Sequence, residues 1–202
     1  MLISSVNIAT PEGLKVVDGL LDRFQAADNS CRDSVSEILN AVKEKGDDAV
    51  LEYGRKFDSP NLTQKQLQVN SAELIAAYEQ VDNEFLETLT KAIERIHEFH
   101  EREMEDSWMQ TREDGTIVGR LVRPVDSAGL YVPGGKGGST PLVSSVLMNG
   151  IPAAIAGVHE RIMVTPPGED GSISPHLLVA AQEIGVTEIY KAGSAWAIAA
   201  LV

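Results

Sequence analysis

The sequence predicts an α/β fold, and three observations carry that prediction. Apolar residues recur at helical spacing through most of the first hundred residues, a hairpin signal follows, and from residue 127 apolar runs alternate with helix-like segments. The 202 residues are 43% hydrophobic and 23% charged, a balance typical of globular proteins. We therefore expect a helix-rich region with a β-hairpin over 1–126 and a parallel β-α-β-α-β-α unit over 127–202.

Start and stop signals divide the first region into helices. The expected boundaries are Thr10-Pro11 before the first helix, Gly46 after the second, Asp47 as cap of the third, Ser71 or Ala72 at the start of the fourth and Asp82 as cap of the fifth. The fifth is the longest, and its expected apolar side carries Phe85, Leu86, Leu89, Ile93, Ile96 and Phe99.

The apolar period changes after residue 106. Asp114-Gly115 lies between two extended runs and predicts a hairpin with a type I′ turn. Strands are then expected at 127–132, 161–167 and 186–190, with helices at 141–148, 174–185 and from 193 onward. Short connections in this order predict a Rossmann-like parallel sheet with right-handed crossovers, whose ligands bind beyond the carboxyl ends of the strands.

A glycine-rich loop follows the first of these strands, in the stretch "GLYVPGGKGGSTPLVSSVLMNG" at 129–150. Backbone without side chains can approach a ligand closely, and the next helix would present free N–H groups, so the loop predicts a phosphate or dinucleotide site that Lys136 could reach. The order of residues is neither G-x-G-x-x-G nor that of a P-loop. A mobile glycine-rich turn with a solvated Lys136 is therefore the alternative.

The charge distribution narrows the range of partners. A net charge of −13 argues against nucleic acid and anionic membranes, since their phosphates would be repelled. Residues 71–114 hold 13 acidic and 4 basic residues, whereas residues 128–202 hold 5 and 3, so the glycine-loop region is nearly neutral. A single cysteine, Cys31, and the lack of a run of ~20 apolar residues favour a cytoplasmic protein without a membrane span.

Candidates for metal binding or bond-making chemistry are weak. His97 and His100 have i, i+3 spacing in a Glu-rich helix, where a solvated helix face is favoured over a metal motif with His at i and i+4. His159 and His176 are isolated. From the residues alone we assign a cofactor-type loop and neither a catalytic residue nor a metal ligand.

Five stretches together resemble a known family. They are "GDDAVLEYGRKFD", "AIERIHEFHERE", "RPVDSAGLYVPGG", "SSVLMNGIPAAIAGV" and "AAQEIGVTEIYKAGSAWAIAAL". In this order the chain resembles the N-terminal half of histidinol dehydrogenases. The resemblance implies a cytoplasmic, zinc-dependent homodimer with aldehyde dehydrogenase-like α/β domains. Such an enzyme oxidises L-histidinol through L-histidinaldehyde to L-histidine with two NAD.

The resemblance also implies site residues. Tyr131 corresponds to a tyrosine that contacts NAD in the family, and we expect the backbone of Pro133, Gly134 and Gly135 to join it. Trp196 stands where the family usually has an NAD-contacting glutamine, and its indole can stack or fill a hole but cannot accept a hydrogen bond. The zinc ligands and the Glu-His pair of the general base belong to the family's second half, which would follow Val202.

Two alternatives to this function stay open: a non-catalytic paralogue or remnant that binds nucleotide or a partner chain, and another NAD-linked enzyme of the aldehyde dehydrogenase type. The chain stops within an apolar helical run, so we expect a truncated chain with apolar surface that a missing half would cover. The residues expected on that surface are Leu142, Val146, Leu147, Ile198 and Leu201.

Overall fold

The structure, a computed structural model, describes residues 5–25, 29–134 and 140–202. These divide into two compact units, Met1–Glu37 and Ile38–Val202, with the boundary inside helix α2 (Asn29–Lys45). The domain boundary expected between residues 126 and 127 stays a prediction. In the first unit, helix α1 (Pro11–Gln25) begins as expected, because the Gly13 N–H donates to Thr10 Oγ1 at 3.1 Å.

Three helices and a short 3₁₀ turn follow in the second unit: α3 (Asp47–Phe57), η1 (Gln64–Gln66), α4 (Ser71–Tyr78) and α5 (Asn83–Glu101). The expected cap of α5 is confirmed, since the Phe85 N–H donates to Asp82 Oδ1 at 2.7 Å. The expected cap of α3 is wrong. Gly46 caps that helix with a φ of 57°, a conformation that glycine adopts without strain, and Asp47 lies in the first turn.

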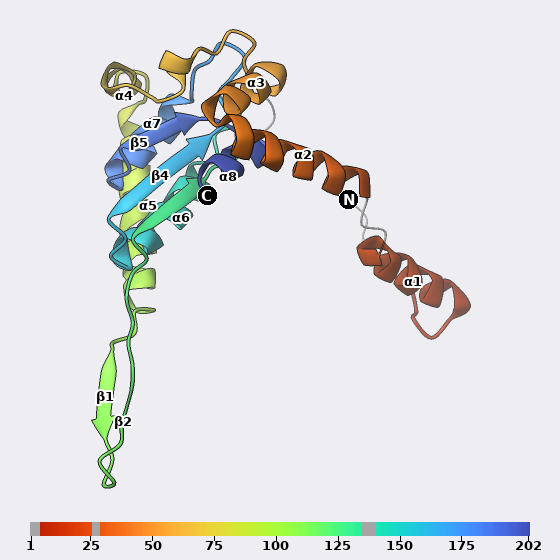
Figure 1. Ribbon diagram of the computed structural model, residues 1–202, viewed down its shortest axis with the longest axis vertical. Coiled ribbons are helices and arrows are strands. Elements are labelled where there is room, and N and C mark those ends of the chain that lie inside the picture. Colours follow the sequence, from red (N-terminus) through yellow and green to blue (C-terminus); the bar gives the residue numbers. More distant parts are fainter. Residues whose placement is uncertain (1–4, 26–28, 135–139) are drawn as a thin grey trace. The chain divides into compact units, whose positions relative to one another are not determined.

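The predicted parallel sheet is confirmed (Figure 1). Its strands are β3 (Ser127–Tyr131), β4 (Glu160–Thr165) and β5 (Glu188–Lys191), in that spatial order. Helices α6 (Val143–Ile155), α7 (Pro175–Glu183) and α8 (Ser194–Ala200) follow the three strands in turn. Helix α6 continues past its expected end at residue 148 and contains Pro152.

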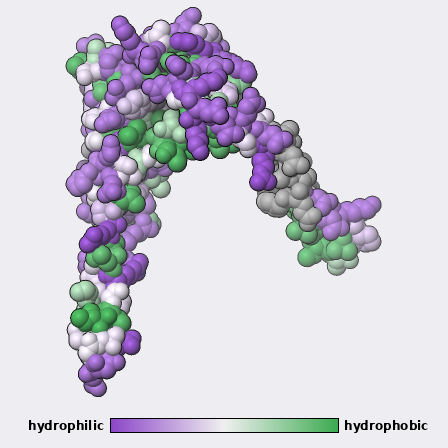
Figure 2. Space-filling view, viewed as in Figure 1, coloured by the Kyte–Doolittle hydropathy of each residue, from purple (hydrophilic) through white to green (hydrophobic). Residues whose placement is uncertain are grey.

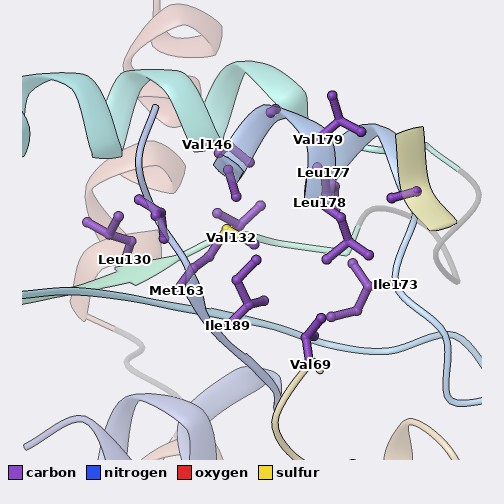
Figure 3. Packing of buried hydrophobic residues seen from close by; sticks show 14 of the residues in the cluster. Val69, Leu130, Val132, Val146, Met163, Ile173, Leu177, Leu178, Val179 and Ile189 are labelled. Carbon is purple, nitrogen blue, oxygen red and sulfur yellow. The ribbon is translucent and has the colours of Figure 1, made fainter. Parts of the chain in front are cut away.

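Alternate side chains of each strand enter two different cores, because successive strand residues point to opposite faces. Helices α4–α7 cover one face (Figure 3), and α3 and α8 cover the other. The strand residues of the first core are Leu130, Met163 and Ile189, and those packed in the second are Tyr131, Val164 and Tyr190.

Two expectations about exposure are wrong. Val146 and Leu147 are 1% and 2% exposed, because α6 turns both into the first core, whereas we expected them on an uncovered surface. Phe99 is 63% exposed at the end of α5, outside the apolar side that we assigned to that helix. Of the other residues expected at the surface, Ile198 is 44% exposed, and Leu142 and Leu201 are half-buried.

The predicted hairpin forms from β1 (Trp108–Thr111) and β2 (Ile117–Arg120), but its turn is not type I′. The Gly115 N–H donates to Arg112 O at 3.0 Å, and Asp114 lacks the positive φ that a type I′ turn requires. Gly115 alone has a positive φ, 85°, as in a type I turn followed by a bulge. Figure 2 shows hydrophobic side chains along this hairpin, where Trp108, Met109 and Ile117 are exposed.

Candidate cofactor site at the carboxyl edge of the sheet

The carboxyl ends of three parallel strands meet at one edge of the sheet (Figure 1). There β3 continues into Val132-Pro133-Gly134, β4 into Pro166 and β5 into Ala192-Gly193. Ligands of parallel α/β sheets bind at such an edge, because the loops that follow the strands converge there. We call the segments 131–134, 165–166 and 191–194 the carboxyl edge.

Tyr131 is held in place by two neighbouring helices. The Ser194 N–H at the start of α8 donates to Tyr131 Oη at 3.2 Å, and Asn149 Nδ2 of α6 donates to the Tyr131 carbonyl at 3.1 Å. Tyr131 is half-buried and packs against the second core. Ser194 has a φ of 49°, which is uncommon for a non-glycine residue. Since Tyr131 Oη accepts from Ser194, its own proton is available to a ligand.

Two glycines bring the loops of the carboxyl edge close together. A Cβ at Gly134 would lie 2.7 Å from Pro166 Cγ, and a Cβ at Gly193 would lie 2.7 Å from Pro166 Cβ. Neither position therefore accepts a side chain unless the Pro166 ring moves. The expected cofactor residues Tyr131, Pro133 and Gly134 thus lie together at this edge, whereas Gly135 and Lys136 lie outside the described residues.

Asp58, the residue that ends α3, also lies at the carboxyl edge, although it is far from the other residues of that edge in the sequence. Its Oδ2 lies 3.4 Å from the position of a Cβ on Gly193, is shielded from water and has no hydrogen-bond partner in the described part of the chain. Burial raises the pKa of this carboxyl to about 6. The sequence analysis missed Asp58, because nothing in the stretch "KFDSP" indicates a contact with residue 193.

Trp196 is a core residue. It is 4% exposed, and its ring stacks on Tyr53 and Phe57 of α3, with centroid distances of 5.8 Å and 5.5 Å. Its Nε1 lacks a hydrogen-bond partner among the described residues. The indole therefore fills the space between α3 and α8, one of the two roles expected from the sequence.

The buried cation of the carboxyl edge is already paired. Lys191 is 3% exposed, and its Nζ forms an ion pair with Glu73. Glu73 also accepts from the Asn70 N–H at 3.1 Å and so caps α4. This pair ties the end of β5 to α4 and leaves Lys191 engaged within the protein.

Within residues 5–25, 29–134 and 140–202, no group of three or more His, Cys, Asp or Glu side chains is arranged so that it could hold a metal ion. His97 lies 3.5 Å from Glu101, and His100 pairs with Glu103, all at one end of α5. The His97 contact is that of a solvated helix face, with its side chain 49% exposed, whereas the His100 side chain is only 16% exposed.

The histidinol dehydrogenase sequence profile matches residues 21–202. The chain belongs to the histidinol dehydrogenase family. It is 71% identical over its whole length to a histidinol dehydrogenase of Desulfotalea psychrophila and covers 46% of that protein. Against the histidinol dehydrogenase of Nitratidesulfovibrio vulgaris it is 50% identical over 91% of its length, or 42% of the relative. The chain thus spans slightly less than half the length of these relatives.

A solved structure agrees with this membership. The crystal structure of histidinol dehydrogenase from Elizabethkingia anophelis superposes with a TM-score of 0.77 at 37% identity. The superposition covers 84% of this chain and 38% of that one. Family membership places the chain among oxidoreductase sequences and supports the α/β class expected from the sequence. In the described part, each helix is too short or too polar to cross a membrane.

Proposed function

We propose that this chain is the NAD-binding part of a histidinol dehydrogenase. The whole enzyme would oxidise L-histidinol to L-histidinaldehyde and then to L-histidine, with two NAD. The observation that carries the proposal is the Tyr131 ring, which a hydrogen bond from Ser194 holds at the carboxyl edge, within a motif that resembles the family's NAD segment. Family membership supports the same function.

The described residues suit a dinucleotide. Gly134 and Gly193 leave bare backbone beside Pro166, the half-buried Tyr131 supplies an aromatic ring, and Asp58 Oδ2 is an acceptor without a donor among these residues. NAD, when bound, supplies the acceptor for hydride. The residues of this chain would bind and orient it, with Tyr131, Pro133 and Gly134 in contact, together with Gly135 outside the described part.

Trp196 changes one contact that the family's glutamine would make. An indole has no amide oxygen to offer the cofactor, and this one is buried against Tyr53 and Phe57. We assign it the role of fixing α8 against α3. The position of Ser194, two residues earlier in α8, and hence of the Tyr131 hydroxyl, depends on that packing.

The zinc ligands and the groups that remove protons from the substrate belong, in this proposal, to the part of the protein outside this chain. We assign no bond-making step to the described residues, because they offer no set of ligands for a metal. We also propose that the full-length protein is a cytoplasmic homodimer that acts on L-histidinol.

A substitution at Tyr131 tests the proposal in the full-length protein, meaning this chain joined to the half that its relatives possess. Tyr131→Ala removes the ring and should raise the KM for NAD about tenfold while raising that for L-histidinol less, since ring packing contributes on the order of 1–1.5 kcal/mol. Tyr131→Phe, the matched control, keeps the ring and should change the KM for NAD two- to threefold. Unchanged KM values in Tyr131→Ala would mean that the loop is structural.

The activity of the 202-residue chain by itself provides a second test. We expect no reduction of NAD by L-histidinol, with or without added zinc, because the described part lacks a plausible metal-ligand set. Steady turnover that a chelator abolishes would contradict this expectation. An inactive full-length protein would instead favour a non-catalytic paralogue.

A further inference from the structure

Asp58 carries a buried carboxylate oxygen that makes no hydrogen bond in the described part of the chain. The turn that contains it is already anchored by other groups: the Asp58 N–H donates to Gly54 O at 2.9 Å, and Ser59 Oγ donates to Glu169 O at 3.0 Å. Oδ2 has no partner in the described part of the chain, and no ion pair includes Asp58 there. Buried polar atoms are nearly always hydrogen-bonded, so this oxygen calls for a donor that residues 5–25, 29–134 and 140–202 do not provide.

The place of this oxygen connects it with the candidate cofactor site. Asp58 Oδ2 packs against Gly193, and the next residue, Ser194, donates to the hydroxyl of Tyr131. The carboxylate and the Tyr131 ring therefore flank the same two residues of the carboxyl edge. A molecule lying along this stretch would meet an aromatic ring at Tyr131 and, after displacing the atoms that shield Oδ2 from water, a hydrogen-bond acceptor at Asp58.

We propose that the Asp58 carboxylate accepts hydrogen bonds from a ribose hydroxyl pair of the bound dinucleotide and thereby selects NAD over NADP. This inference rests on the proposed function. A vicinal diol offers two donors, which match the two oxygens of a carboxylate. A 2′-phosphate in the same place would bring negative charge against a carboxylate that forms no ion pair within the described residues, which disfavours NADP.

The experiment measures the dissociation constants of NAD and NADP by calorimetry on the full-length protein, the isosteric variant Asp58→Asn and the control Asp170→Asn. Asp170 is a carboxylate that is already satisfied by Ser172, so the control makes the same charge change on a nearby loop. We expect Asp58→Asn to raise the dissociation constant of NAD about tenfold and to leave that of NADP unchanged or lower. The Tm of the cofactor-free variant should be unchanged or higher. The control should keep wild-type values.

A ligand-side measurement keeps the inference testable if Asp58→Asn fails to fold. The wild-type protein should bind the NAD analogue that lacks the 2′-hydroxyl of the adenosine ribose about tenfold more weakly than NAD. Equal binding of the two, or Asp58→Asn with wild-type affinities and an unchanged NAD/NADP ratio, would overturn the inference while leaving NAD binding itself intact. Wild-type protein that binds neither NAD nor NADP would overturn the proposed function, and this inference with it.

Discussion

The two faces of the three-stranded sheet are built differently. The face covered by α4–α7 is an apolar core in which Met163, Val179 and Ile189 are fully buried. The face covered by α3 and α8 is smaller, and it packs Trp196 against the partly exposed rings of Tyr53 and Phe57. Within the described residues, Asp58 Oδ2 and Trp196 Nε1 lack a hydrogen-bond partner on this second side, and Thr165 Oγ1 of β4 and Gln182 Oε1 of α7 lack one on the first.

What distinguishes the second side is that one of its unpartnered atoms belongs to a carboxylate beside Gly193 and Tyr131, where a ligand could supply a donor. Close packing of apolar side chains stabilises a fold, whereas a buried polar atom without a partner costs about 1–3 kcal/mol. Asp58 therefore lowers the free energy of unfolding unless a ligand supplies a hydrogen-bond donor. This destabilising carboxylate lies beside Tyr131 and Gly193. We infer that the α4–α7 face stabilises the unit and that the α3–α8 side supplies the cofactor site.

The largest expected effect concerns the first face. Ile189→Ala should lower the free energy of unfolding by about 3 kcal/mol, because it opens a cavity in a fully buried core. Its matched control is Ile198→Ala on α8, where the side chain is 44% exposed and the loss should stay under about 1 kcal/mol. Urea denaturation of the two variants measures the difference. Equal losses would contradict the contrast between the faces.

A smaller effect is expected from pH. Because the pKa of Asp58 is raised to about 6 in the folded protein from an ordinary 3.8, the folded state binds its proton more tightly than the unfolded state does. Its contribution to stability is therefore fully present below pH 3.8 and lost as the pH rises through about 6. Relative to wild type, cofactor-free Asp58→Asn should gain about 1 kcal/mol over this window, a value reduced for the partial exposure of the group. A stability difference that does not vary with pH would show that Asp58 is solvated.

The smallest effect is expected at Trp196. Trp196→Phe keeps an aromatic ring against Tyr53 and Phe57 and removes an indole N–H that lacks a partner, so the lost volume and the removed cost partly offset each other. The free energy of unfolding should change by less than about 1 kcal/mol. A loss of 3 kcal/mol or more in urea denaturation would reveal a partner for Nε1.

The sequence predicted the elements well because local signals determine them. The cap at Asp82, the stop at Gly46 and the alternation of strands and helices after residue 127 all depend on neighbours within a few positions. The burial of Val146 and Leu147 was mispredicted because α6 is apolar on most sides, and periodicity alone cannot tell which side faces the sheet.

The site was only partly predictable for a similar reason. Tyr131 and Gly134 lie in one loop, so a single motif could indicate them. Asp58 meets Gly193 across 135 positions of sequence, and Trp196 meets Tyr53 across 143, and no local pattern encodes such contacts. The Asp114-Gly115 dipeptide correctly predicted a hairpin but not its turn type, so even a strong local signal did not determine the turn conformation.

Hydrogen–deuterium exchange of the full-length protein with and without NAD tests the central claim, that the carboxyl edge binds the cofactor and the α4–α7 face does not. We expect NAD to slow exchange in peptides that cover residues 129–134 and 193–197, where the Tyr131 hydroxyl and the Ser194 N–H meet. Peptides over residues 177–181 of α7, which are buried in the first core, should keep their rates. Protection confined to other segments, or none at saturating NAD, would contradict the account.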